Sequence, residues 1–575
     1  MRERAEALLR QAIAIARELG HFEYLSIQSH SLGLLLDEMD RPAEAEDAMA
    51  QCLKYGARIG DYRHMSRASM FLASAKLGRG DGKAALAELK NTLRFDMRDT
   101  VRRGTLETSM APRIAANALS CAAAGGDVCT AVLVAESAKA LPLAISLMRG
   151  VPLQAAAAAG DASRGSAVEG LFRRREELRL KAMWEPDSAA EIESQLEQVD
   201  AELTGARQEA ALRDVRYARW HDATYLEVTE PATARRILGE TGARATLAGF
   251  LVHGSSIYTY ALWSDGEMAE RLPLPRELAS IKEDAGMALD PAVMAALAQV
   301  FLEPLAGRLE KLEPRDRLIL SPSAPLDRLP FGMLRFRNRY LCEVATLSAV
   351  DGIGMLEGCA ARPAAPVREA VCIGAPPRPD VPDLSYAARE LERVTEVLEK
   401  AGVKARPALN GRAATIGALA ARIGSCDVAH FACHALAPGA GHAEAQLLLA
   451  PDLLSKDSGV LSEDRILFHL ALKPGCHINL AGCRTGAAGG AGRFFPHGLV
   501  PAFLVAGARS VLASLWPLED EPASRFQSLY YEELISGRTP ADALAATQRA
   551  CIQGNAGEPL RQPGGWAPYL LHGLG

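Results

Sequence analysis

Two short stretches of the chain constrain its fold more than any other feature. Val-Ala-His-Phe-Ala-Cys-His ends at His434, and Ile-Asn-Leu-Ala-Gly-Cys-Arg-Thr-Gly places Cys483 49 residues later. Each is an apolar run that ends at a polar, reactive side chain, a pattern typical of strands in an open parallel sheet, whose carboxyl ends carry the chemistry. If the two strands are neighbours, an imidazole and a thiol meet there. That pair is the arrangement of a cysteine nucleophile activated by histidine.

The last third of the chain alternates strand and helix around these two stretches. A helix after Thr539 is predicted because Thr539 can cap it and Pro540 suits its first position. Alternation of this kind predicts a mostly parallel sheet covered by helices on both faces. The other predicted elements are strands at Ala370–Ile373 and Ser510–Leu515 and helices at Tyr386–Lys400 and Leu499–Ala506.

Further motifs accompany the histidine and the cysteine in a fixed order. The histidine precedes the cysteine by about 50 residues, as in caspases. Together the motifs resemble the CHAT domain, a caspase-like peptidase unit that bacteria often attach to tetratricopeptide (TPR) repeats. The motifs are Leu326–Phe331, His430–His434, Leu480–Gly486, Ala502–Val511, Ser514–Asp520 and Trp566.

The resemblance implies that His434 and Cys483 are the catalytic pair. A nearby imidazole raises the thiolate fraction of a cysteine, which can then attack a peptide carbonyl while the histidine protonates the leaving amine. The developing oxyanion needs donors, for which the backbone N–H of Cys483 and a group near Ala435 are candidates. Gly482 would let the backbone approach the substrate closely.

Two positions depart from the family pattern. Ala435 stands where the family usually has glycine after the histidine, and Arg484 stands where it often has glutamate after the cysteine. Neither change removes a reacting group. Both could alter substrate preference.

An acidic residue in related proteins lines the pocket for the side chain that precedes the cut. Asp520, with Glu519 beside it, occupies the matching place after the Leu-Trp strand. An acidic pocket would favour lysine or arginine through charge-assisted hydrogen bonds. Alternatively, Asp520 caps a helix that begins near Pro522. The two interpretations are about equally supported.

A metal site is a weaker interpretation of the same region. His430, Cys433, His434, Cys476 and His477 could supply zinc ligands, but they lack the paired Cys-x-x-Cys spacing of convincing sites. On a continuous strand His430 would share a face with His434, while Cys433 would point the other way. We therefore expect no metal and no cofactor, and His430 as a packed neighbour.

The first 150 residues carry an internal repeat. Small and apolar residues recur at a spacing of 40, which indicates helix-turn-helix units that resemble TPR repeats of slightly expanded length. The pattern begins in the second helix of a unit, so this helix either caps the array or follows earlier residues. A last helical pair is expected around Ala118–Met148, with its turn at Ala124–Asp127. The recurring positions are Ala5, Ala45 and Ala85; Leu9, Met49 and Leu89; Ile13, Leu53 and Leu93; and Leu32 and Leu72.

The predicted class is therefore α + α/β, with four segments. Residues 1–160 form TPR-like helical repeats, and 161–222 form a charged helical hairpin, interrupted at Pro186, that links them to the rest. Residues 223–365 form a non-catalytic, pseudo-caspase half, and 366–575 form the catalytic caspase-like half. Solenoids present extended surfaces to proteins, so partner recognition by the repeats is favoured over a purely structural role.

The net charge and the cysteine content limit the classes of partner and the cellular compartment that we expect. The net charge of −6, with no long basic block, makes direct nucleic-acid binding unexpected. Eleven scattered cysteines are typical of reduced thiols in a cytosol. The first residues lead into a charged amphipathic helix instead of a signal peptide, and the apolar stretch Leu499–Trp516 contains Arg509, so no membrane span is expected. A cytoplasmic location follows.

Two functions from different classes agree with these sequence features. The first is a cysteine endopeptidase that cleaves a protein substrate and is controlled by a regulatory protein or ribonucleoprotein on the repeats. Relatives of this architecture act in bacterial antiviral defence, some docked to CRISPR-type RNA-guided effectors and some cleaving pore-forming proteins. The second is a scaffold with a catalytically silent caspase-like fold. Because an unrestrained endopeptidase is harmful, we expect the pair to be misaligned until a partner binds.

Overall fold

The computed structural model describes the chain with several gaps. Its two compact units are Met1–Val228 and Thr229–Gly575, and each is treated by itself. The described residues are 1–103, 109–139, scattered positions between 171 and 202, 228–279 without 243, 290–323, 329–374 without 365, 387–436 without 406, 445–452, 457–481, 498–516 and 520–575.

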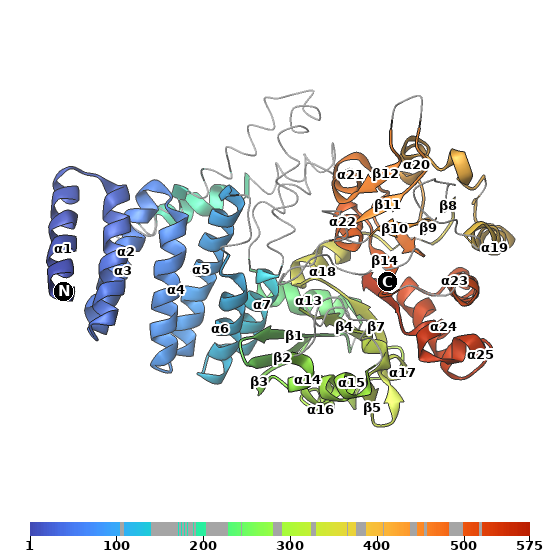
Figure 1. Cartoon of the computed structure of the whole chain (residues 1–575), viewed down its shortest axis with the longest axis horizontal. Helices are drawn as coiled ribbons and strands as arrows, with labels where there is room; N and C mark the ends of the chain where they lie inside the picture. Colours follow the sequence, from blue (N-terminus) through green and yellow to red (C-terminus); the bar gives the residue numbers. More distant parts are fainter. Residues whose placement is uncertain are drawn as a thin grey trace. The chain divides into compact units, whose positions relative to one another are not determined.

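The first unit is a row of antiparallel helices joined by short turns (Figure 1). Gly60 ends α3 in the left-handed conformation, and the Asp61 carboxylate accepts a hydrogen bond from the His64 N–H at the start of α4. Pro42 occupies the first turn of α3, where its missing N–H costs nothing. The helices are α1 (Arg2–Glu18), α2 (Phe22–Glu38), α3 (Pro42–Ile59), α4 (Tyr62–Gly78), α5 (Gly82–Arg103), α6 (Ala111–Ala123) and α7 (Val128–Ala138).

The predicted 40-residue spacing coincides with these helices. Ala45 on α3 and Ala85 on α5 are both 0% exposed, which shows that these small residues lie where neighbouring helices pack. At Gly33 on α2, an added Cβ would come within 2.8 Å of the Met49 side chain. Helix-turn-helix repeats are thus confirmed, and their identity as TPR repeats stays a prediction.

The predicted hairpin at 161–222 lies mostly outside the described residues. Leu178 packs there with Ile192, Val199 and Leu196, and residues 191–199 are helical. Pro186 lies outside, so the hairpin stays a prediction.

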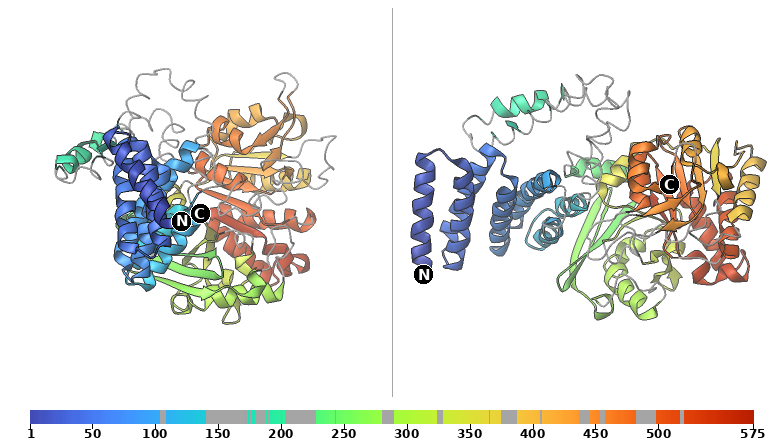
Figure 2. Two further views of the ribbon diagram at one scale, coloured as in Figure 1. Left: turned by 60° about the vertical axis from the view of Figure 1, so that its left-hand side comes forward. Right: turned by 45° about the horizontal axis from the view of Figure 1, so that its top comes forward.

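The second unit is built on one large sheet (Figure 2). Its strand order is β3-β2-β1-β4-β7-β15-β14-β13-β9-β8. Most neighbouring pairs are parallel; β1–β2, β2–β3 and β14–β15 are antiparallel. The predicted mostly parallel sheet is confirmed. The strands are β1 (Thr246–His253), β2 (Ser256–Trp263), β3 (Gly266–Pro273), β4 (Arg317–Ser321), β7 (Thr346–Ala349), β8 (Ala370–Gly374), β9 (Val428–Ala432), β13 (His477–Leu480), β14 (Ser510–Ser514) and β15 (Tyr569–Gly573).

Strand directions divide this sheet into two sets. β8, β9, β13 and β14 run parallel to one another, whereas β15 is antiparallel to β14 and parallel to β7. The carboxyl ends of β8, β9, β13 and β14 therefore meet at one edge. β15 was not predicted, because a five-residue apolar run at the end of a chain carries no periodicity that separates strand from helix.

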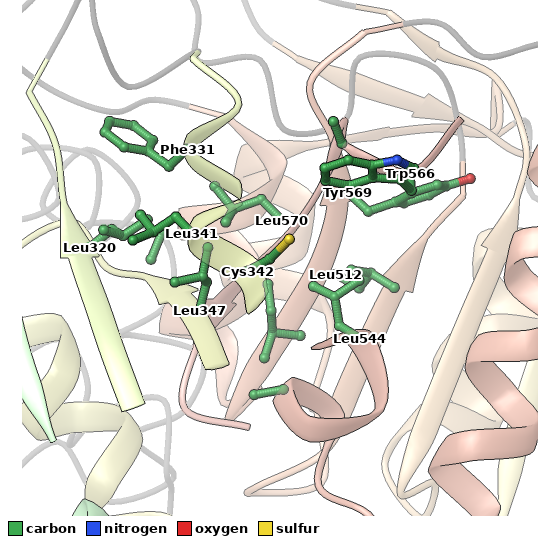
Figure 3. Packing of buried hydrophobic residues seen from close by; sticks show 14 of the residues in the cluster. Leu320, Phe331, Leu341, Cys342, Leu347, Leu512, Leu544, Trp566, Tyr569 and Leu570 are labelled. Atoms are coloured by element: carbon green, nitrogen blue, oxygen red, sulfur yellow. The ribbon is translucent and has the colours of Figure 1, made fainter. Parts of the chain in front are cut away.

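Helices cover both faces of the sheet. On one face, a continuous apolar core lies under α14 (Arg276–Ala279), α15 (Pro291–Leu297), η2 (Ala298–Leu302), α16 (Ala306–Leu309), α17 (Leu341–Val344), α19 (Ala387–Lys400), α23 (Asp520–Ile535) and α24 (Pro540–Ile552). On the other, Phe431 of β9 packs against Phe503 of α22 (Leu499–Ala506), which also contacts α18 (Ile353–Ala360) and α21 (Glu463–His469). Figure 3 shows the core where β7 and β15 meet α17 and α24. The remaining helices include α13 (Pro231–Thr241), α20 (Ile416–Ile423), α25 (Glu558–Arg561) and α26 (Pro563–Trp566), with single turns η4 (Phe331–Met333) and η5 (Gly411–Ala413).

Most of the predicted elements in this unit are confirmed within a residue or two. α22 has the predicted bounds, α19 begins one residue later, and Thr539 caps α24 by accepting a hydrogen bond from the Asp542 N–H. Two small sheets complete the unit. They are β5 (Arg335–Phe336) with β6 (Arg339–Tyr340), and β10 (Ala435–Leu436) with β11 (Gln446–Leu448) and β12 (Val460–Ser462).

Candidate active site

β9 and β13 are parallel neighbours, and their register relates the two predicted catalytic residues. Leu480 of β13 pairs with Phe431 of β9, and the Ala481 N–H donates to the Phe431 carbonyl at 3.0 Å. His434 follows Phe431 by three residues, and Cys483 follows Leu480 by three residues. Cys483 and Gly482 themselves lie outside the described residues. The strands that lead to the two residues therefore end side by side at the same edge.

His434 lies in the link between β9 and β10, because β9 ends at Ala432 instead of continuing through the motif. Its side chain is half-buried, and its carbonyl accepts a hydrogen bond of 2.9 Å from the Leu448 N–H. This bond belongs to the ladder in which β10 pairs with β11. The expectation that His430 and His434 share one face of a continuous strand is thus wrong, since the chain leaves the main sheet before His434.

Ala435 occupies an edge strand directly after His434. It is paired with Leu447 in an extended conformation that any residue adopts, so its replacement of the family's glycine causes no backbone strain. His434 and Leu448 form the hydrogen-bonded pair next to it, so alternation along the ladder directs the N–H of Ala435 away from β11. In the part of the chain that the structure describes, no strand pairs with that side of β10.

The cysteines other than Cys483 are all buried. Cys433 precedes the histidine directly, yet it is only 1% exposed, and burial raises the pKa of its thiol to about 12. Burial likewise raises the pKa of Cys372 on the neighbouring β8 to about 11. These thiols stay protonated near neutral pH and are poor nucleophiles.

A buried polar layer lies beneath the ends of β9 and β13. His430 and Asn479 are register partners, and each lies four residues before a predicted catalytic residue. The His430 Nε2 lies 3.1 Å from the Glu390 Oε1 on α19, within ion-pair distance but not aligned as a hydrogen bond. The Asn479 amide donates to the Gln527 Oε1 on α23 at 2.8 Å. This layer fixes the two strands to the helices behind them.

Sequence reasoning missed the partners in this layer. Glu390 and Gln527 come from helices far away in the chain, and nothing in their local pattern marks them as buried. Asn479 did carry a signal, because an amide between Ile478 and Leu480 in an apolar run must find a buried partner.

His477 does not suit a zinc site. Its Nδ1 lies 2.9 Å from the Ser510 hydroxyl and its Nε2 lies 2.9 Å from the Tyr530 hydroxyl, so both ring nitrogens are engaged. Burial lowers the pKa of His477 to about 3, with a smaller contribution from His430. Among the described residues, no group of three or more candidate ligands could hold a metal ion.

Asp520 is the first residue of α23, so the helix begins two residues before the expected position. Glu519 lies outside the described residues, and the proposed substrate pocket stays a prediction. No helix in the described residues is long and apolar enough to cross a membrane.

Two buried histidines predict the acid sensitivity of this unit. Burial lowers the pKa of His477 to about 3 and that of His572 on β15 to about 4. Below a pH of about 6.5 the unfolded chain binds protons that the folded chain excludes, so stability falls as pH falls. Full stability is expected above that pH. Near pH 5 the free energy of unfolding should decrease by roughly 2 to 3 kcal/mol per pH unit from these two groups.

Urea unfolding at pH 7, 6 and 5 measures this slope. His572→Gln should remove from this slope the contribution of about one bound proton. A free energy of unfolding that is unchanged between pH 7 and pH 5 would contradict the assignment.

Residues 291–574, from the start of α15 through β15, match the CHAT domain family. The chain carries a CHAT domain. The match confirms the resemblance and, with it, a caspase-like cysteine protease fold for residues 291–574. No curated protein matches the chain.

Solved structures similar to the chain include two kinds of protease. The Arg-specific cysteine proteinase gingipain R is 13% identical with a TM-score of 0.34, over 50% of this chain and 68% of that one. Separase from the Saccharomyces cerevisiae separase–securin complex is 11% identical with a TM-score of 0.39, over 99% of this chain and 53% of that one. The chain thus spans about half the length of separase.

Proposed function

We propose that the protein is a cysteine endopeptidase that uses Cys483 as nucleophile and His434 as general acid and base. The Cys483 sulfur forms a bond to the substrate carbonyl carbon, and the peptide C–N bond breaks as His434 gives a proton to the departing amine. Water then attacks the thioester, with His434 accepting its proton, which releases the acid and the free thiol. No metal or cofactor is needed to balance these steps.

The observation that carries this proposal is the register of β9 and β13. Leu480 and Phe431 pair, and the proposed nucleophile and base follow them at equal distances along the chain. The other cysteines are buried, which leaves Cys483 as the candidate thiol.

The edge of β10 supports a role in binding an extended peptide. The outward C=O group of Ala435 can accept a hydrogen bond from a substrate strand, the mode of recognition called β-augmentation. The N–H of Ala435 and that of Cys483 are the proposed donors to the oxyanion, and Gly482 allows the close approach. Because Ala435 is unstrained, it offers no ground for preferring a catalytically silent scaffold.

The proposal also states which substrate residues are selected and what controls the activity. Asp520, with Glu519, would select lysine or arginine before the cut. A regulatory protein or ribonucleoprotein bound to the helical repeats of α2–α7 would align the catalytic pair, in antiviral defence in a bacterial cytoplasm. The repeats support this part because stacked helical hairpins expose long surfaces suited to proteins.

A diverse peptide library tests the proposal. The wild-type chain and Cys483→Ala are compared with and without lysate of the source cell. We expect cleavage that disappears in Cys483→Ala, a preference for basic residues that weakens in Asp520→Asn, and stronger cleavage with lysate. No cleavage under either condition would favour the scaffold. Full activity without lysate would contradict the control by a partner.

A further inference from the structure

In the described part of the chain, one apolar face of α1 is left uncovered. Among the described residues, the exposed large apolar side chains all lie between Met1 and Ile59. Three of them share one stripe of α1, with Leu8 exposed by 59%, Ile15 by 51% and Leu19 by 74%. Ala5 and Ala12 complete the stripe with a spacing of alternately three and four residues, the spacing of a helix-to-helix seam. Single exposed apolar residues are ordinary, but a continuous stripe marks an interaction site.

The next repeat shows what fits on such a face. Forty residues further on, Ala45, Ala48 and Cys52 of α3 occupy the positions of Ala5, Leu8 and Ala12. They are 0%, 7% and 0% exposed, because α3 packs closely against α2. The equivalent face of α1 is therefore shaped to receive a helix.

The stripe is complementary to itself when a second α1 runs antiparallel to it. With residue i of one helix opposite residue 20 − i of the other, Leu8 meets Ala12 of the second copy and Ile15 meets its Ala5. Each layer then combines one large and one small side chain. Alternation of this kind fills the space between two closely approaching helices.

The charged residues beside the stripe fit the same antiparallel register. Arg4 and Glu18 flank the stripe and are exposed, and neither has an ion-pair partner within the described residues. By contrast, Arg10 and Glu6 of α1 are engaged with each other and with α3 or its preceding turn. In the antiparallel arrangement Arg4 lies opposite Ala16 of the second copy, and Glu18 of that copy is two residues further on, within reach of the long Arg4 side chain. The same pair forms on the other side of a two-fold axis near residues 10 and 11. An interface of this symmetry uses one patch twice.

We propose that a second copy of this chain covers the exposed face of α1, so that two chains associate through an antiparallel α1–α1 contact. α1 is about 25 Å long, so the contact lies at the small end of stable interfaces and its dissociation constant should be micromolar. The inference is independent of the proposed peptidase activity.

Sedimentation velocity of the full chain from about 1 to 100 μM measures the association. The wild-type chain should shift from 61.3 kDa to twice that mass. Ile15→Glu should abolish the dimer. Arg4→Glu or Glu18→Arg alone should raise the dissociation constant about tenfold, because each change places like charges at both pairs. The double variant R4E/E18R should restore the wild-type dissociation constant.

Cross-linking tests the register in a Cys483→Ala background, since the other cysteines are buried. Gln11→Cys lies near the proposed axis and should form a disulfide-linked dimer. Glu3→Cys, on the far side of α1, should not. A monomer up to 100 μM would overturn the proposal and show that something other than a second copy covers the face. Equal cross-linking of both variants, or no rescue in R4E/E18R, would overturn the antiparallel arrangement.

Discussion

His434→Ala should lower kcat/KM for the best library peptide by about 10³- to 10⁴-fold, because the leaving amine loses its proton donor and the thiol loses its base. The substitution should leave the fold intact. The backbone carbonyl of His434 accepts a hydrogen bond from the Leu448 N–H, and alanine keeps that bond. Steady-state kinetics of the partner-activated chain measure the loss, and thermal unfolding measures the fold. Cys483→Ala should cost at least as much activity.

Cys433→Ala is the matched control for the thiol. This cysteine is adjacent to His434 in sequence, but it is 1% exposed and its pKa is raised to about 12 by burial. Its replacement should reduce stability slightly and leave kcat/KM within about twofold. If Cys433→Ala abolished cleavage while Cys483→Ala did not, the assignment of the nucleophile would be wrong. Alkylation by iodoacetamide under native conditions should likewise modify Cys483 before any other cysteine.

Trp566→Ala should destabilise the second unit by about 3 to 5 kcal/mol, the usual cost of removing a large aromatic side chain from a core. Trp566 is 0% exposed, and its ring lies edge-on to Tyr340 with 5.2 Å between the centroids. Figure 3 shows Trp566 among the buried side chains of the core, which also include Tyr569. Urea unfolding followed by circular dichroism measures the change.

Trp566→Phe provides the control. The indole Nε1 is buried without a hydrogen-bond partner in the described residues, so removing that N–H offsets part of the lost packing. We expect a cost well below that of alanine. Equal losses for both variants would mean that Trp566 acts through a hydrogen bond instead of through packing. A loss below 1 kcal/mol for alanine would show that the site collapses around the substitution.

Much of the fold could be predicted from local patterns. The 40-residue recurrence of Ala45 and Ala85 identified the helical repeats, because a helix that packs closely against its neighbour needs small residues at fixed positions. Mainly apolar runs such as Val428–Ala432 identified buried strands, since a parallel sheet covered on both faces holds few polar residues on either side. The predicted cap at Thr539 marked a helix start through a hydrogen bond made within one turn.

The candidate catalytic residues could be predicted from the sequence, but the residues packed around them could not. His434 was expected on a strand, and the structure places it in a link, because the pairing of Ala435 with Leu447 draws the chain away from the main sheet. Glu390 and Gln527 could not be found, since their burial depends on which helix lies over which strand.

The sequence alone determined the helical repeats, the alternating strands and helices, and the motifs that led to the CHAT family, because each depends on residues close together in the chain. The tertiary structure decided which strands and side chains lie next to one another. It joined β15 to β14 and β7, buried Cys433, and brought the ends of β9 and β13 together in register. These outcomes depend on hydrogen bonds and packing between segments far apart in sequence, which no local pattern encodes.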